Sequence, residues 1–155
     1  TKFRRNNLGF IFQQYNLLQT LTVKENVEVG KEVSLDPLQI EETLKEVGLD
    51  GMMDKYPYQL SGGEQQRVSI ARAIVKNPKI MFCDEPTGAL DEETAKGVLS
   101  VIERLNKEHG TTVVLITHNP NIAMMADKVI KLNSGKVVDV YQNMTKKEAK
   151  DILWG

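Results

Sequence analysis

Ile80-Met81-Phe82-Cys83-Asp84-Glu85 joins an unbroken apolar run to two adjacent carboxylates. A short continuous apolar run is typical of a parallel strand that is buried on both faces. A second run of this kind, Thr112–Thr117, is followed directly by His118. Because ligands of parallel sheets bind beyond the carboxyl ends of the strands, the sequence predicts a functional site where these two strands end.

The rest of the chain alternates short apolar runs with helical periodicity, which indicates an α/β fold. We expect strands at residues 8–12, 80–83 and 112–117 and a hairpin of 129–132 with 137–141. Mostly helical structure is expected over 22–60, with N-caps at Thr22 and at Asp36 before Pro37. Further helices are expected after Ser61, from Asp91 to His109, from Asn119 through Ala126, and from Thr145 onward. From Ile80 onward this order predicts a three-layer α/β half-domain.

Composition narrows the class of protein. The 155 residues are 41% hydrophobic and 26% charged, with 20 basic and 21 acidic side chains. A net charge of -1 argues against strong non-specific binding to nucleic acid. The single cysteine, Cys83, cannot form an internal disulfide and fits a reducing compartment, where we expect it to be a small buried side chain. No apolar run approaches the roughly 20 residues that span a bilayer.

Asp84 and Glu85 follow their strand as adjacent carboxylates, a combination that suits Mg²⁺ chemistry. One carboxylate can hold the ion and the other can orient a nucleophilic water. The alternative is that Asp84, Glu85 and Pro86 are only a solvated strand end.

Leu60-Ser61-Gly62-Gly63-Glu64-Gln65-Gln66-Arg67 is a glycine-rich helix start. Its unpaired backbone amides and positive dipole end favour an anion. Ser61 and Glu64 also form a capping box, which is a purely structural alternative. Glycine weakens a helix start unless another group must come close, so Gly62 and Gly63 favour phosphate binding.

These motifs, in this order, resemble those of the ATP-binding-cassette (ABC) ATPase family. Five segments carry the resemblance: Phe12-Gln13 is similar to the Q-loop, Leu60–Gln66 to the signature, Ile80–Glu85 to the Walker B strand, Gly88–Asp91 to the D-loop, and Thr117-His118 to the switch histidine. The resemblance implies a P-loop NTPase-type (RecA-like) fold with an ABC helical subdomain, and a head-to-tail dimer that encloses two ATP molecules.

The resemblance also implies a role for each site residue. Asp84 would hold Mg²⁺ and Glu85 would polarise the attacking water, while His118 would contact the γ-phosphate. Gln13 would sense Mg²⁺ and water and report to a membrane partner. The remaining implied residues belong to the dimer: Ser61, Gly62, Gly63, Glu64 and Gln65 would bind the nucleotide of the opposite subunit, and Asp91 would line the interface. Arg67 and Arg72 are expected to be structural, and His109 to complement the dipole of its helix.

Three regions are expected within a partial nucleotide-binding domain of residues 1–155. Residues 14–76 would hold the Q-loop, helical subdomain and signature helix, 77–142 the catalytic core, and 143–155 a C-terminal helix. No Gly-x-x-x-x-Gly-Lys-Ser/Thr segment is present, so the chain resembles a cassette without its N-terminal strands and P-loop. We therefore expect weak ATP binding and no hydrolysis by this chain alone, and sheet edges that favour swapped or aggregated assemblies.

The function implied is that of the ATP-binding subunit of an ABC transporter, at the cytoplasmic face of the membrane. Its partners would be a transmembrane permease, contacted through the Q-loop and helical subdomain, and a second nucleotide-binding domain, as a homodimer. Residues 9–18 and 21–28 most resemble the branch for lipoprotein release and for macrolide and peptide export. Alternatives are a DNA-repair or chromosome ATPase, a translation-associated cassette protein, and a non-catalytic interaction module. The first would need a long coiled coil, for which 13–60 is too short and lacks heptads.

Overall fold

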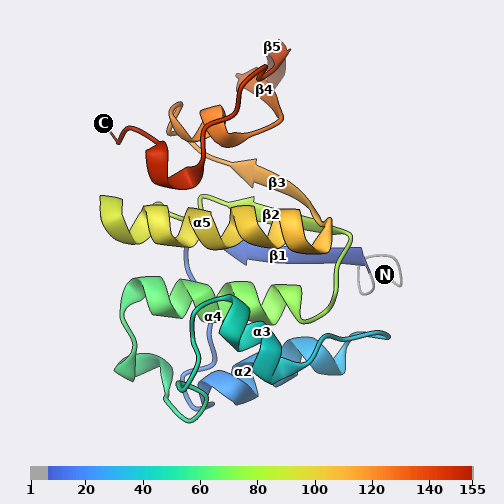
Figure 1. Cartoon of the computed structure of the whole chain (residues 1–155), viewed down its shortest axis with the longest axis vertical. Helices are drawn as coiled ribbons and strands as arrows, with labels where there is room; N and C mark the ends of the chain where they lie inside the picture. Colours follow the sequence, from blue (N-terminus) through green and yellow to red (C-terminus); the bar gives the residue numbers. More distant parts are fainter. Residues whose placement is uncertain (1–6, 155) are drawn as a thin grey trace.

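Three apolar segments form a parallel sheet in the structure, a computed structural model that describes residues 7–154 (Figure 1). The strands are β1 (Leu8–Phe12), β2 (Ile80–Asp84) and β3 (Thr112–Ile116), in the spatial order β1-β2-β3. Both pairs are parallel and in continuous register along all three strands. The three strands expected from the sequence are thus confirmed, and so is the α/β class.

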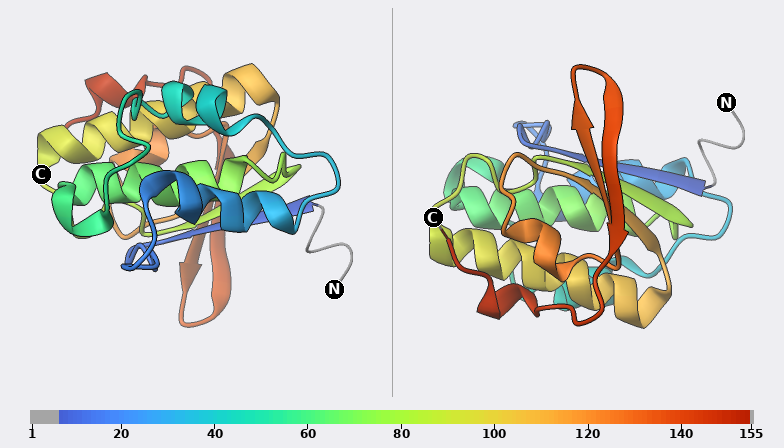
Figure 2. Two further views of the ribbon diagram at one scale, coloured as in Figure 1. Left: turned by 90° about the horizontal axis from the view of Figure 1, so that it is seen from below. Right: turned by 90° about the horizontal axis from the view of Figure 1, so that it is seen from above.

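One face of this sheet is covered by helices and the other is open. Side chains alternate between the faces, and Ile11, Met81 and Cys83 are fully buried in one cluster with residues of α4 and α5. On the opposite face, Phe10 and Ile116 are 38% and 50% exposed. Strand β3 is therefore exposed on one face and not buried on both faces as its apolar run predicted. Figure 2 shows the β4–β5 hairpin projecting on the side away from α5.

Helix α4 (Gly62–Ile74) and helix α5 (Glu92–His109) form the covering layer. Ser61 and Glu64 make both hydrogen bonds of the predicted capping box, and Asp91 caps α5. Gly110, at φ 66°, ends α5 in the left-handed region that glycine adopts without strain. Both helices begin and end within one residue of the predicted bounds, apart from the last turn before Asn77.

Two shorter helices, α2 (Val23–Glu32) and α3 (Ile40–Glu46), pack against α4 on the side away from the sheet. The capping box at Thr22 is confirmed. The N-cap predicted at Asp36 is wrong, because α3 begins only at Ile40. The reason is tertiary: the Leu38 amide donates to the Val75 carbonyl at 2.8 Å and holds this stretch outside the helix. A 3-10 turn, η1 (Pro57–Gln59), leads into α4.

The last third of the described chain holds the hairpin of β4 (Lys128–Asn133) and β5 (Lys136–Gln142). Ser134 and Gly135 both have positive φ, as a two-residue hairpin turn requires, so the predicted hairpin is confirmed.

Two helices predicted in the same region are only 3-10 turns, η2 (Ile122–Met125) and η3 (Ala149–Asp151). Their amides donate to carbonyls three residues back rather than four, as those of Met124 and Ala126 do to Asn121 and Ala123, which is the 3-10 pattern. The C-terminal helix expected over 143–155 is therefore wrong for the residues that the structure describes.

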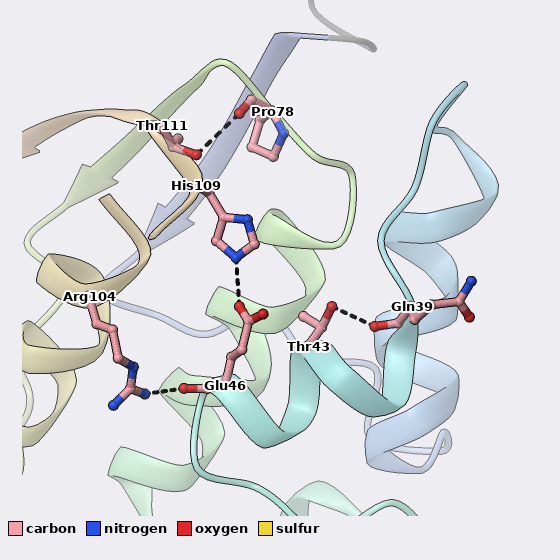
Figure 3. A network of polar contacts seen from close by, with 7 residues as sticks. All are labelled: Gln39, Thr43, Glu46, Pro78, Arg104, His109 and Thr111. Carbon is pink, nitrogen blue, oxygen red and sulfur yellow. Dashed lines mark hydrogen bonds and ion pairs between the residues drawn. The ribbon is translucent and has the colours of Figure 1, made fainter. Parts of the chain in front are cut away.

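Polar contacts tie the end of α3 to the end of α5 (Figure 3). His109 Nε2 lies 2.6 Å from Glu46 Oε2, and Arg104 donates to the Glu46 carbonyl oxygen. His109 thus pairs with a carboxylate on another helix, a role that its position at a helix end did not predict. Glu46, Glu108 and His109 are also close enough together to hold a metal ion, and they are the one such group of three among residues 7–154.

The close approach of α2 and α4 yields a stability prediction for Gly30. A Cβ atom at this buried position would lie 2.2 Å from the Arg72 carbonyl oxygen, so Gly30→Ala must push the two helices apart. We expect a loss of about 1–3 kcal/mol in the free energy of unfolding, measured by urea denaturation. Val29→Ala, on the exposed side of the same helix, should change it by less than about 0.5 kcal/mol. Equal stability of the Gly30→Ala variant and the parent would refute this packing.

Candidate functional site

The register of the sheet brings the predicted site residues to one edge. Phe12, Asp84 and Ile116 are direct partners in one row across β1, β2 and β3. The three segments that follow the strands therefore start next to one another, at the shared carboxyl edge of the sheet. The residues that follow each strand are those singled out from the sequence: Gln13, then Glu85, then Thr117 and His118.

Glu85 and His118 are in direct contact. Glu85 Oε1 accepts a hydrogen bond from the His118 backbone amide at 2.7 Å and lies 3.5 Å from His118 Nε2. The Glu85 amide donates to the Ile116 carbonyl at 2.9 Å, so the turn after β2 is fixed to the end of β3. The Glu85 side chain is 20% exposed, whereas the His118 imidazole is 99% exposed. A carboxylate is thus held in place beside an imidazole that is open to a ligand.

Glu85 also has an unusual backbone conformation, with φ at 48°. A residue other than glycine in the left-handed region costs of order 1–3 kcal/mol and persists only where its surroundings enforce it. Here the hydrogen bonds to Ile116 and His118 enforce it. The strain aims the Glu85 carboxylate toward the end of β3.

Asp84 and Gln13 lie beside this pair, and their chemistry fits Mg²⁺. The Asp84 side chain is exposed, and none of the ion pairs among residues 7–154 involves it. An exposed, unpaired carboxylate and an amide oxygen are hard ligands of the kind Mg²⁺ prefers. Gln13 lies over Gly88, since a Cβ there would be 2.8 Å from the Gln13 amide carbon. The segments after β1 and β2 therefore touch.

The start of α4 presents an exposed hydroxyl. Ser61 Oγ accepts from the Glu64 amide at 3.2 Å, and Glu64 Oε1 accepts from the Ser61 amide at 2.9 Å. In this arrangement the hydroxyl proton of Ser61 stays available to an acceptor outside the chain. Gln65 instead donates to the carbonyls of Pro57 and Leu60, which steadies the turn before the helix. Glu64 and Gln65 thus support the helix start from within.

The two glycines of α4 differ in what surrounds them. Gly63 is buried, and a Cβ there would lie 2.3 Å from Thr94 Cγ2, so its packing against α5 alone requires glycine. The inference that phosphate binding explains this glycine is therefore not needed. Gly62 is exposed, and a Cβ there would lie 3.1 Å from Tyr15 Oη. Gly62 leaves the backbone beside Ser61 open to a ligand.

Asp91 is the N-cap of α5, and its carboxylate accepts from the Thr94 amide at 3.2 Å. Hydrogen bonds from Thr94 lower the pKa of the Asp91 carboxyl below its usual value. Because Gly63 packs against Thr94, the starts of α4 and α5 lie side by side. Ser61 and Asp91 are thus brought to neighbouring helix ends.

A groove of about 350 Å³ adjoins the edge of the sheet. Its walls come from the segment after β1 and from single residues of α4 and the turn after β2: Gln13, Gln14, Tyr15, Asn16, Leu17, Gln19, Gln65 and Ala89. Arg72 fixes this segment by donating to the carbonyls of Tyr15 and Asn16, which confirms its structural role. Burial lowers the pKa of Arg72.

Gln66 is the residue of this region that sequence reasoning missed. It is fully buried, and its amide nitrogen donates to the carbonyls of Phe12 and Pro86. The signal was available: Gln66 and Ile70 are four residues apart on the buried side of an amphipathic helix, where a polar side chain needs a partner.

The family model described as ABC transporter matches residues 1–88. The chain belongs to the ABC transporter family. It is 47% identical over 157 residues to the ABC transporter ATP-binding protein MG065 of Mycoplasma genitalium, a match covering 99% of this chain and 34% of that protein. It is also 45% identical over 141 residues to the macrolide export ATP-binding/permease protein MacB of Mannheimia succiniciproducens, covering 88% and 22%. The chain thus spans about a third of the length of the first relative.

Solved structures of the ABC family support the fold. The dimeric ATP-binding cassette MJ0796, in a post-hydrolysis state with ADP and Pi, matches with a TM-score of 0.77 at 39% identity. The match covers 93% of this chain and 66% of that one. The α/β cassette fold predicted from the sequence is therefore confirmed. None of the helices in residues 7–154 has the length and apolarity needed to cross a membrane.

Burial of Cys83 within β2 predicts an unreactive thiol in this ABC family member. The side chain is 0% exposed, and burial raises the pKa of the Cys83 thiol to about 12. We expect iodoacetamide at pH 8 to label the folded protein at least about 100-fold more slowly than the urea-unfolded protein, because the thiolate is the nucleophile. Mass spectrometry of the Cys83 peptide measures this, and comparable labelling rates in both states would contradict it.

Proposed function

We propose that this chain provides the catalytic edge of an ATPase subunit of an ABC transporter, in which two cassettes face each other head to tail and hydrolyse ATP. The observation that carries the proposal is the contact between Glu85 and His118 at the carboxyl edge of the sheet. A carboxylate beside a freely exposed imidazole suits attack by water on a phosphoryl group. Gln13 and Asp84 lie at the same edge.

Glu85 acts as the group that orients and polarises the attacking water. Its Oε1 is engaged by His118, which leaves the second carboxylate oxygen as an acceptor for that water. The His118 ring, open to solvent, donates to the transferring phosphate. Asp84 and Gln13 would hold Mg²⁺, which when bound neutralises charge on the phosphate oxygens.

The start of α4 serves the nucleotide of the second cassette. Ser61 and Gly62 are exposed there and offer a hydroxyl and helix-end amides to phosphate oxygens. Glu64 and Gln65 act from within the chain, by capping the helix and steadying the turn before it. Asp91 lies at the neighbouring helix end and lines the interface between the cassettes.

The groove beside Gln13 is the proposed contact for a membrane permease. It is formed chiefly by the segment 13–17, which connects the sheet edge to α2. The name of the MacB relative joins an ATP-binding to a permease function, which supports this partner. With a permease as its partner, the subunit would lie at the cytoplasmic face of the membrane. The segment between Gln13 and Leu60 folds as short helices rather than a coiled coil, which disfavours a chromosome ATPase. No nucleic acid partner is proposed, in keeping with the net charge of -1.

Glu85→Gln tests the proposed function in the complete cassette assembly. The change keeps the size of the side chain but removes the basic carboxylate, so we expect kcat for ATP hydrolysis to fall about 100- to 10,000-fold. Equilibrium binding of ATP should change by less than about threefold, since ground-state contacts stay.

Glu93→Gln is the matched control, because Glu93 is an exposed glutamate in the first turn of α5. It should leave kcat unchanged. Full turnover by the Glu85→Gln variant, or an equal loss in the control, would contradict the role of Glu85.

A further inference from the structure

One buried side chain joins three parts of the candidate site. Gln66 of α4 is 0% exposed, and its Nε2 donates to the Phe12 carbonyl at 3.1 Å and to the Pro86 carbonyl at 2.6 Å. These acceptors are 54 and 20 residues away along the chain. A single amide thus connects α4 to the end of β1 and to the turn after β2.

The two acceptors directly adjoin the residues of the proposed chemistry. Phe12 immediately precedes Gln13, and Pro86 immediately follows Glu85. The two N–H bonds of one amide nitrogen diverge at a fixed angle, so the Gln66 side chain also sets the spacing between the two loops. Both hydrogen bonds of Gln66 go to the backbone, so it acts on Gln13 and Glu85 through the main chain next to them.

The other half of the amide argues against a role in stability alone. Gln66 Oε1 is buried without a hydrogen-bond partner among the residues that the structure describes. A buried unsatisfied acceptor is costly, and the amide bears this cost while its nitrogen pairs with the Phe12 and Pro86 carbonyls. The amide is therefore better explained by what its two donors hold in place.

We propose that Gln66 is a positioning residue for ATP hydrolysis, whose amide fixes Gln13 and Glu85 relative to each other and to the start of α4. This inference rests on the proposed function. It adds that one amide joins the helix bearing Ser61 to the loops bearing Gln13 and Glu85. A nucleotide bound at the start of α4 thereby sets the geometry of the groups that act at the edge of the sheet.

Gln66→Met and Gln66→Glu in the complete cassette assembly test the proposal. Methionine keeps the length of the side chain but has no donor, so the two loops are released. We expect kcat to fall about 10- to 100-fold, as for a small misplacement of reacting groups, while KM and the affinity for ATP change less than about threefold. Rates are normalised to the nucleotide-binding sites measured by titration, so that loss of folded protein does not count.

Gln66→Glu supplies a readout that a purely structural role would not give. An ionised carboxylate has no donor, whereas a protonated carboxyl regains one. We expect the kcat of this variant, relative to the parent at the same pH, to rise as pH falls from 8 to 6. The ratio for Gln66→Met should stay flat over the same range. If Gln66→Met does not fold, the pH profile of Gln66→Glu decides the question.

Asn106→Leu is the matched control, since Asn106 Nδ2 donates to the Thr111 carbonyl at 2.6 Å near the opposite edge of the sheet. It removes an amide-to-carbonyl bond of the same kind, and should lower Tm without changing the normalised kcat. Unchanged kcat in Gln66→Met, or equal losses in Gln66→Met and Asn106→Leu, would overturn the positioning role while leaving the proposed function intact. A parent protein without ATPase activity would overturn both.

Discussion

The parallel register of β1, β2 and β3 is the constraint on which the candidate site depends. Phe12, Asp84 and Ile116 share one row, so the three chain segments leave the sheet at the same height. A slip of one residue in either pairing would turn every side chain of that strand to the other face. The contact between Glu85 and the amide of His118 could not then form. The geometry of the site is thus set by hydrogen bonds within the sheet, before any ligand is present.

The covered face of the sheet maintains this register. Ile11, Met81 and Cys83 pack in one cluster with α4 and α5, and their burial excludes the alternative in which these side chains face solvent. On the open face Phe10 stacks on Phe82, with ring centroids 5.5 Å apart, so β1 and β2 are also aligned by a cross-strand aromatic pair. The two faces specify the same pairing through different side chains.

Sequence patterns were reliable wherever the deciding contacts are local. The capping boxes of Ser61 and Thr22 were predicted correctly because each is complete within four residues. The start of α3 was not, because Leu38 is held by Val75, 37 positions further along the chain. The pairing of His109 with Glu46, 63 residues apart, has no local signal either. Motifs placed Gln13, Glu85 and His118 at strand ends, but the contact between Glu85 and His118 follows only from the register of β2 with β3, which no local pattern encodes.

Helix α4 combines an exposed polar start with a buried polar side chain, and this combination has a mechanical consequence. Ser61 and Gln66 are five residues apart, which corresponds to about 7.5 Å along a helix. A helix with a hydrogen-bonded cap is rigid over that distance, and Gly63 packs it directly against Thr94 of α5. On the proposed role of Gln66, a displacement at Ser61 would reach the carbonyls of Phe12 and Pro86 through this helix and the Gln66 amide. The close packing that stabilises α4 thus also connects the exposed Ser61 at its start to the buried Gln66.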